Sequence, residues 1–177
     1  TAHRVLEENP HLEAVFTSYQ MGDAYSERPP VGATPRIEMM SGRDLLHGYM
    51  VRSIHALGCC AIWKKDRLKS FGGMAQLGSG FSPYSDNLLT IKAGLLNQVA
   101  FIHAPMVFFR THGASASWSS TDLDSYISAQ KDLCRHALSV FEKDAVKQDL
   151  QINLYKLLGF FCLTYFFEVV SRNPSLQ

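Results

Sequence analysis

The residue best suited to chemistry in this sequence is Asp86, which follows Ser85 at the start of a predicted helix. A carboxylate in the first turn of a helix stays ionised, because the free backbone N–H groups and the helix dipole favour its anion. Such a carboxylate can take a proton from a hydroxyl group about 3 Å away. Taken alone, however, an Asp at this position is more often an ordinary acidic residue of a helix N-terminus.

Several residues elsewhere in the chain add to this candidate site. Gly72 and Gly73 carry no Cβ, so a turn at this point lets the backbone pass close to a ligand. Arg110 and His112 alternate after a predicted strand and can share a face, where they suit phosphate oxygens. Their structural alternatives are an ion pair for Arg110 and a loop cap for His112. Trp63 could stack on a sugar ring, although core packing is the favoured interpretation.

The elements that must position these residues alternate between strands and helices. Runs of β-branched and aromatic residues predict strands, whereas apolar residues three or four positions apart predict helices. The predicted strands cover residues 12–19, 58–64, 98–103 and 106–111, and Pro105 divides the last two. The predicted helices cover residues 1–9, 41–50, 65–71, 85–93, 121–142 and 147–170, and residues 20–36 and 73–84 form loops. The pattern predicts an α/β fold with a helical C-terminal part.

Residues of known capping preference define the ends of three of these helices. Ser41 and Asp44 have the spacing of a capping box, and Ser85 is predicted to cap the helix that carries Asp86. Gly72-Gly73 is predicted to stop one helix, and Gly94 to end another in a left-handed turn.

Composition excludes several classes of protein. The chain has 177 residues, of which 46% are hydrophobic and 19% charged, so it is neither disordered nor collagen-like. Its length favours one domain with a real core. The formal net charge of +1 argues against a nucleic-acid partner, since such proteins usually carry a strong basic excess. No signal peptide is visible at the first residues, and the sequence does not begin with Met, so we expect a piece of a longer cytoplasmic protein.

The four cysteines do not predict a metal site. Cys59, Cys60, Cys134 and Cys162 lack paired metal-ligand spacing, and adjacent residues on a strand point to opposite faces. The favoured interpretation is small apolar side chains in a reducing compartment.

The apolar run over residues 154–167 is interrupted by Lys156 and closed by Glu168. A membrane-spanning helix needs about 20 apolar residues, so this run is too short to cross a bilayer. The favoured interpretation is a helix that faces the core or a partner, and the alternative is peripheral docking at a membrane surface.

The order of motifs between residues 59 and 117 resembles the acceptor half of family 2 glycosyltransferases. In that family a strand and a short helix end in Gly-Gly-Phe, where residues 72–74 here read Gly-Gly-Met. An acidic pair, usually Glu-Asp, then opens a helix that ends in Gly, where this chain has Ser85-Asp86. After a further strand the family has an Arg-x-His…Ser segment, which matches residues 110–117. The resemblance covers roughly residues 1–118.

This resemblance implies a GT-A fold for residues 1–118, with residues 119–177 as a C-terminal helical extension. It implies metal-dependent, inverting transfer of a sugar from a nucleotide-sugar donor to a polysaccharide, lipid-linked or protein acceptor, as in bacterial cell-envelope polysaccharide biosynthesis. Asp86 aligns with the family's general base, which takes the proton of the acceptor hydroxyl. The residues that the resemblance places near substrate or diphosphate are Arg110, His112, Ser85, Gly72, Gly73 and Trp63.

The chain also departs from the family. Ser85 replaces the first acid of the pair, and Met74 replaces Phe. The family holds Mg²⁺ or Mn²⁺ with an Asp-x-Asp motif, which this sequence lacks, so the main metal ligands are expected outside it and only His112 is a candidate ligand within it. These departures keep a second interpretation open, in which the chain is a non-catalytic binding or assembly module that interacts through its aromatic C-terminal helix.

Two further expectations follow from the sequence. A nucleotidyltransferase is the weaker alternative, because no Gly-rich phosphate loop with Lys or Arg opens the sequence. A partial sheet exposes an edge and an apolar face, which would favour a homodimer.

Overall fold

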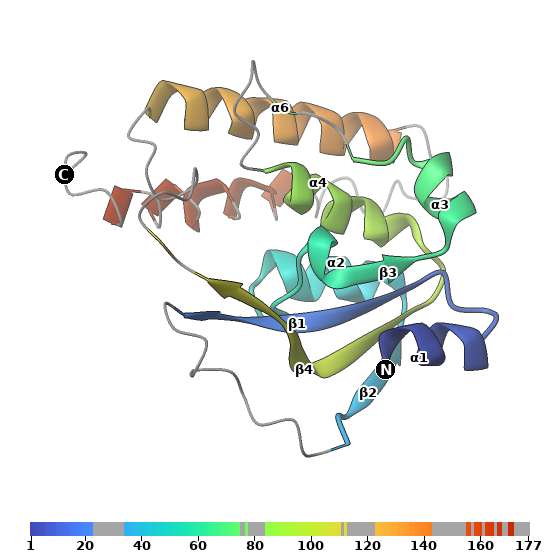
Figure 1. The fold of residues 1–177 in the computed structure, drawn as a ribbon. Helices are drawn as coiled ribbons and strands as arrows, with labels where there is room; N and C mark the ends of the chain where they lie inside the picture. Colours follow the sequence, from blue (N-terminus) through green and yellow to red (C-terminus); the bar gives the residue numbers. More distant parts are fainter. Residues whose placement is uncertain are drawn as a thin grey trace.

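The computed structural model describes residues 1–22, 34–74, 77, 84–110, 112 and 123–142, together with residues 155, 156, 158–160, 162–164, 166, 167, 170 and 171. Its centre is a mixed sheet of four strands in the order β2-β4-β1-β3 (Figure 1). β1 (Ala14–Gly22) runs parallel to β4 (Val99–Arg110), while β2 (Ile37–Met40) and β3 (Ala61–Trp63) are antiparallel to their neighbours. The α/β class predicted from the sequence is therefore confirmed.

β4 is one strand of 12 residues, so the prediction of two strands divided by Pro105 was wrong. The register between β1 and β4 shifts on both sides of Ser18, and Ser18 is the residue that faces Pro105. Proline has no N–H to donate and is tolerated in strands at such irregularities. The strand predicted over residues 58–64 was also too long, because Gly58–Cys60 forms a 3-10 turn, η2, before β3.

Helices cover both faces of this sheet. α1 (Ala2–Glu8) places Val5 against Leu12, Val15, Ala100 and Ile102 on one face. The other face is covered by α2 (Gly42–Met50) and by a 3-10 turn, η3 (Ala93–Leu95), whose apolar residues surround Phe16 and Phe101. α2 and η3 approach at backbone distance, since a Cβ on Gly42 would lie 2.1 Å from the carbonyl oxygen of Ala93.

Ser41 caps α2 as predicted. Its hydroxyl accepts a hydrogen bond from the backbone N–H of Asp44 at 3.1 Å and donates to the Asp44 carboxylate at 2.6 Å. α4 (Ser85–Lys92) confirms the helix predicted over residues 85–93, but both predicted caps were wrong. Ser85 is the first helical residue and makes no cap, and the chain continues from α4 into η3 without a left-handed residue at Gly94.

α6 (Leu123–Glu142) lies beyond α4, as Figure 1 shows, and confirms the helix predicted over residues 121–142. Its buried residues Tyr126, Ala129, Leu133, Ala137 and Phe141 share a core with α2 and α4. Leu158 joins the same core, and the described residues between 155 and 171 are helical. Among all the residues that the structure describes, no helix combines the length and apolar character needed to span a membrane.

Candidate functional site

Asp86 lies half-buried in the first turn of α4, beside the turn η2. A Cβ on Gly58 would lie 2.7 Å from the carbonyl oxygen of Asp86 and 2.7 Å from the Cβ of Leu89. Only glycine therefore lets η2 rest directly on α4. On the other side, Thr17 of β1 donates its hydroxyl to the carbonyl of Cys60 at 3.3 Å. The carboxylate is thus positioned by contacts that run from the sheet through η2 to the helix.

The Cys59 thiol is a neighbour of this carboxylate. Cys59 is exposed, and its thiol is within hydrogen-bonding reach of the Cys60 sulfur and the Asp86 carboxylate. The hydrogen bond to Cys60 raises the pKa of Cys59, and burial and the negative charge of Asp86 raise it further. The same hydrogen bond lowers the pKa of Cys60. Asp86 therefore faces a neutral thiol, a weak donor that leaves acceptor capacity on the carboxylate.

The Gly72-Gly73 turn follows α3 (Lys65–Ser70) and ends it as predicted. Both glycines have positive φ angles, 73° and 64°, which side chains with a Cβ rarely adopt. Lys92 holds this turn from the end of α4, because its ammonium donates to the carbonyls of Phe71 at 2.8 Å and Gly73 at 3.0 Å. Lys92 is 5% exposed, and burial lowers its pKa. The turn is thereby tied to the same helix that carries Asp86.

Trp63 and Ser85 are both partly buried in this region. The Trp63 ring meets Phe16 and Phe71 edge-on, with centroids 5.5 and 6.3 Å away, so it forms part of the core beneath β3. Its indole nitrogen and the Ser85 hydroxyl are buried and have no hydrogen-bond partner among the described residues. For Trp63 this packing matches the favoured interpretation of the sequence.

Arg110 and His112 are exposed at the far end of β4. Arg110 is in register with Gly22, which lies five residues beyond Thr17 on β1. At about 3.3 Å per residue, Arg110 is therefore roughly 17 Å along the sheet from Thr17, the strand residue that contacts η2. The described residues do not bring this pair together with Asp86, and residues 113–120 lie outside them.

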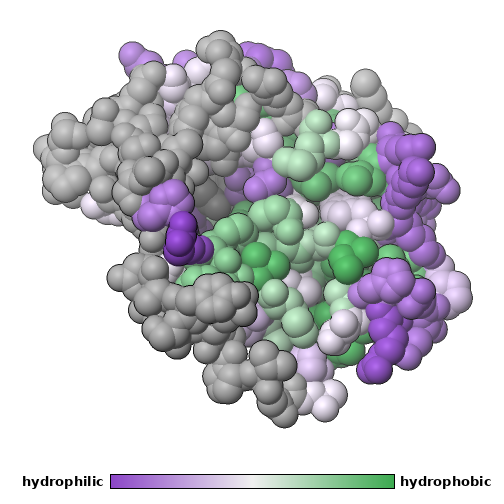
Figure 2. All heavy atoms as spheres, in the orientation of Figure 1, coloured by the Kyte–Doolittle hydropathy of each residue, from purple (hydrophilic) through white to green (hydrophobic). Residues whose placement is uncertain are grey.

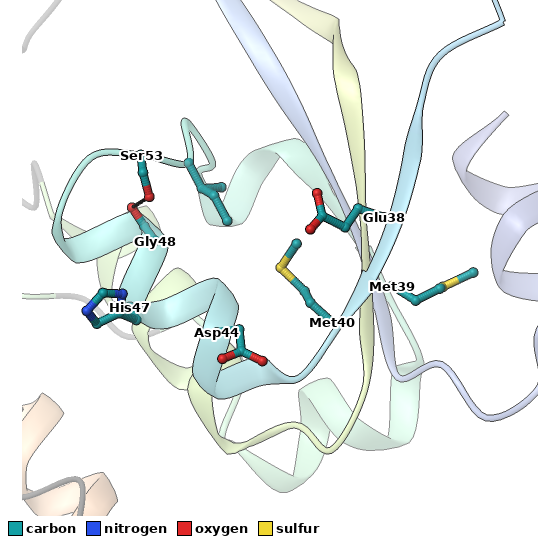
Figure 3. A pocket seen from close by; sticks show the side chains of 8 residues that line it. Glu38, Met39, Met40, Asp44, His47, Gly48 and Ser53 are labelled. Carbon is teal, nitrogen blue, oxygen red and sulfur yellow. Dashed lines mark hydrogen bonds between the residues drawn. The ribbon is translucent and has the colours of Figure 1, made fainter.

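A separate pocket of about 380 Å³ opens at the opposite edge of the sheet, between β2 and α2 (Figure 3). Two of its carboxylates are already paired. Glu38 accepts a bond from Arg36 at 2.9 Å and contacts His103 at 2.7 Å, and Asp44 is held by the α2 cap. The residues that line it are Glu38, Met39, Met40, Asp44, His47, Gly48, Ser53 and Ile54.

Sequence reasoning missed this pocket, the Cys59 contact and the role of Lys92. The one available signal was Lys92 itself, a lone cation in the otherwise uncharged stretch of residues 87–96. The two adjacent cysteines gave no signal, since contact with Asp86 depends on a turn more than 25 residues earlier in the chain. Among the described residues, no group of three or more His, Cys, Asp or Glu side chains is placed to hold a metal ion.

Comparisons with known proteins add no family to these observations. No protein-family model, curated protein or solved structure matches the chain.

Proposed function

We propose that the chain is the acceptor-side portion of a GT-A-type inverting glycosyltransferase, with Asp86 as its general base. The observation that carries this proposal is the placement of Asp86: a half-buried carboxylate in the first turn of α4, within hydrogen-bonding reach of the Cys59 thiol, which is a weak donor. The ordered motifs from residue 59 to residue 117 supply the substrate class. Lys92 ties the Gly72-Gly73 turn to the same helix, at the end opposite to Asp86 and about 9 Å along its axis.

In the proposed reaction, the acceptor hydroxyl gives its proton to the Asp86 carboxylate as its oxygen attacks the anomeric carbon of the donor sugar. The bond between that carbon and the nucleoside diphosphate breaks, and the diphosphate takes the bonding electrons. Holding the carboxylate and the acceptor hydroxyl in hydrogen-bonding geometry is how positioning would contribute to rate. The resemblance implies Mg²⁺ or Mn²⁺, but the described residues provide no ligand set for it, so we assign the metal no step here.

The sheet edge at β3 supports the idea of a partial catalytic domain. β3 pairs only with β1 in the described sheet, and Ile62 at its centre is 38% exposed. Figure 2 shows apolar surface on the face where β1 and β3 lie. A further strand added at this edge would extend the sheet on the side of η2 and Asp86.

The test uses the protein translated from the complete gene, a panel of UDP-, GDP- and dTDP-sugars, and Mn²⁺. We expect Asp86→Asn to reduce glycoside formation by at least about 100-fold while the Kd of the donor, measured by calorimetry, stays within about twofold. Asp66→Asn is the matched control, because Asp66 also lies in the first turn of a helix but is exposed. Turnover of Asp86→Asn at the wild-type rate would contradict the base assignment.

A binding or assembly module is the second candidate function. Four large apolar residues of the C-terminal helical region are 48–67% exposed, namely Tyr155, Phe160, Leu163 and Phe167. Exposed apolar side chains on one region suit a protein partner, a second copy of the chain or a membrane surface. No calorimetric signal with any nucleotide-sugar, combined with self-association that Phe167→Ser abolishes, would favour this function over glycosyl transfer.

A further inference from the structure

Two cysteines from different helices meet on the side of the molecule away from the sheet. The Sγ atoms of Cys134 on α6 and Cys162 in the C-terminal helical region are 3.3 Å apart. Next to them, the Gln130 side chain donates to the carbonyl of Cys162 at 3.2 Å. The two helical segments lie side by side in Figure 1, so the thiols face one another across a helix–helix contact.

Packing holds this contact in place. Leu133 and Ala137 of α6 are fully buried, Leu158 is 3% exposed, and both cysteines pack against this same core. The cysteines themselves are half-buried rather than enclosed in the core. The folded core therefore holds the two sulfurs so that forming a bond of about 2.05 Å requires them to close by only about 1.3 Å.

The two thiols also differ in their readiness to ionise. A hydrogen bond from Cys162 lowers the pKa of Cys134 to about 7, against the opposing effect of burial, and the same contact raises the pKa of Cys162. Near neutral pH, Cys134 is thus partly thiolate, and the thiolate is the form that attacks a disulfide.

We propose that Cys134 and Cys162 form a redox modification site, which a small-molecule disulfide such as glutathione disulfide converts into an intramolecular disulfide. The Cys134 sulfur attacks one sulfur of the reagent and releases one glutathione thiolate. The Cys162 sulfur then attacks Cys134, and the second glutathione leaves. The protein loses two protons and two electrons, and the glutathione disulfide is reduced to two thiols.

The adjacent pair Cys59 and Cys60 provides an internal contrast. Neighbouring Cα atoms are about 3.8 Å apart, which is shorter than the roughly 4.4–6.8 Å of an unstrained disulfide. The bond proposed between Cys134 and Cys162 closes a separation of 28 residues and links α6 to the helical region that carries the exposed aromatic side chains. This proposal does not depend on the glycosyltransferase function.

The experiment incubates the folded protein with glutathione disulfide at pH 7.5, alkylates the remaining thiols with N-ethylmaleimide, and identifies linked peptides by mass spectrometry. We expect a peptide pair joined through Cys134 and Cys162, two alkylated thiols of the four cysteines, and a Tm raised by roughly 5–10 °C. Dithiothreitol should reverse all three changes. Cys134→Ser should abolish them, whereas Cys59→Ser should leave the Cys134–Cys162 link and the rise in Tm intact.

A second measurement does not depend on any variant. The equilibrium between this disulfide and glutathione gives an effective concentration for the two thiols, which we expect to be at least about tenfold higher in the folded protein than in urea. Equal values in the two states, stable glutathione adducts on both cysteines, or links only between chains would each overturn the proposal.

Discussion

Carboxylates lie near both edges of the sheet, but they differ in the hydrogen-bond partners that surround them. At the β2 edge, Glu38 is paired with Arg36 and His103, and Asp44 is held by Ser41, although a pocket of about 380 Å³ opens beside them. At the β3 edge, Asp86 faces a neutral thiol on a turn packed directly against its helix. The comparison shows that the described pocket and the carboxylate better suited to accept a proton lie in different places.

The largest expected effect comes from a bulky side chain placed beside Asp86, compared with one placed in the β2 pocket. Cys59→Trp would cover the approach to Asp86 and should reduce sugar transfer by at least about 100-fold. Ser53→Trp would fill the β2 pocket, which it lines as an exposed residue, and should change transfer by less than about threefold. Product formation is measured for both, with circular dichroism as the folding control. Loss of transfer only in Ser53→Trp would place the acceptor site at the β2 edge.

The next effect tests the close contact beneath the Asp86 site. Gly58→Ala places a Cβ 2.7 Å from the backbone of Asp86, so η2 or α4 must shift, and we expect a loss of about 2–3 kcal/mol in the free energy of unfolding. Gly159→Ala is the control, because a Cβ there meets nothing within 4 Å. Urea denaturation should show the control unchanged or stabilised by up to about 1 kcal/mol. Equal stability of both variants would contradict the contact.

A smaller effect is expected from the buried ammonium that holds the Gly72-Gly73 turn. Lys92→Met leaves the carbonyls of Phe71 and Gly73 without their donor and should cost about 1–2 kcal/mol of unfolding free energy. Lys65→Met, on the exposed side of α3, should stay within about 0.5 kcal/mol of wild type. If the two lysine variants unfold at the same urea concentration, Lys92 does not stabilise the turn.

The smallest effect belongs to the β2 edge. Glu38→Gln removes the charge that pairs with Arg36 and His103 near the surface, and such pairs contribute less than about 1 kcal/mol. The difference from wild type should shrink further at 1 M salt, because screening weakens exposed pairs. A loss above about 2 kcal/mol, or one insensitive to salt, would show that Glu38 is more than a surface ion pair.

Local signals in the sequence were sufficient where short-range chemistry decides the structure. Ser41 with Asp44 predicted the cap of α2, and the Gly72-Gly73 pair predicted the end of α3, because both depend on residues within one turn. Ser85 and Gly94 carried equally plausible local signals and were misread. Ser85 is the first residue of the helix rather than the cap before it, and the chain runs on from the helix into η3, which packs against α2.

The parts of the candidate site that sequence reasoning missed all depend on contacts between distant segments. Pro105 does not interrupt β4 because the shifted register opposite Ser18 accommodates it, and that register is set by a strand about 85 residues earlier in the chain. Lys92 reaches a turn 19 residues away, and Cys59 meets a helix that begins 26 residues later. Such pairings follow from tertiary packing, which single-sequence patterns do not encode.

The glycine that lets η2 rest on α4 has a consequence for large-scale mutagenesis. Every replacement at position 58, alanine included, should lower cellular abundance, because the collision is with the Asp86 carbonyl oxygen and the Leu89 Cβ, neither of which can rotate away. Replacements at position 86 should preserve abundance and remove turnover. A library of variants scored separately for protein level and for product would therefore distinguish a structural role at residue 58 from a catalytic role at residue 86, although the two residues are in contact.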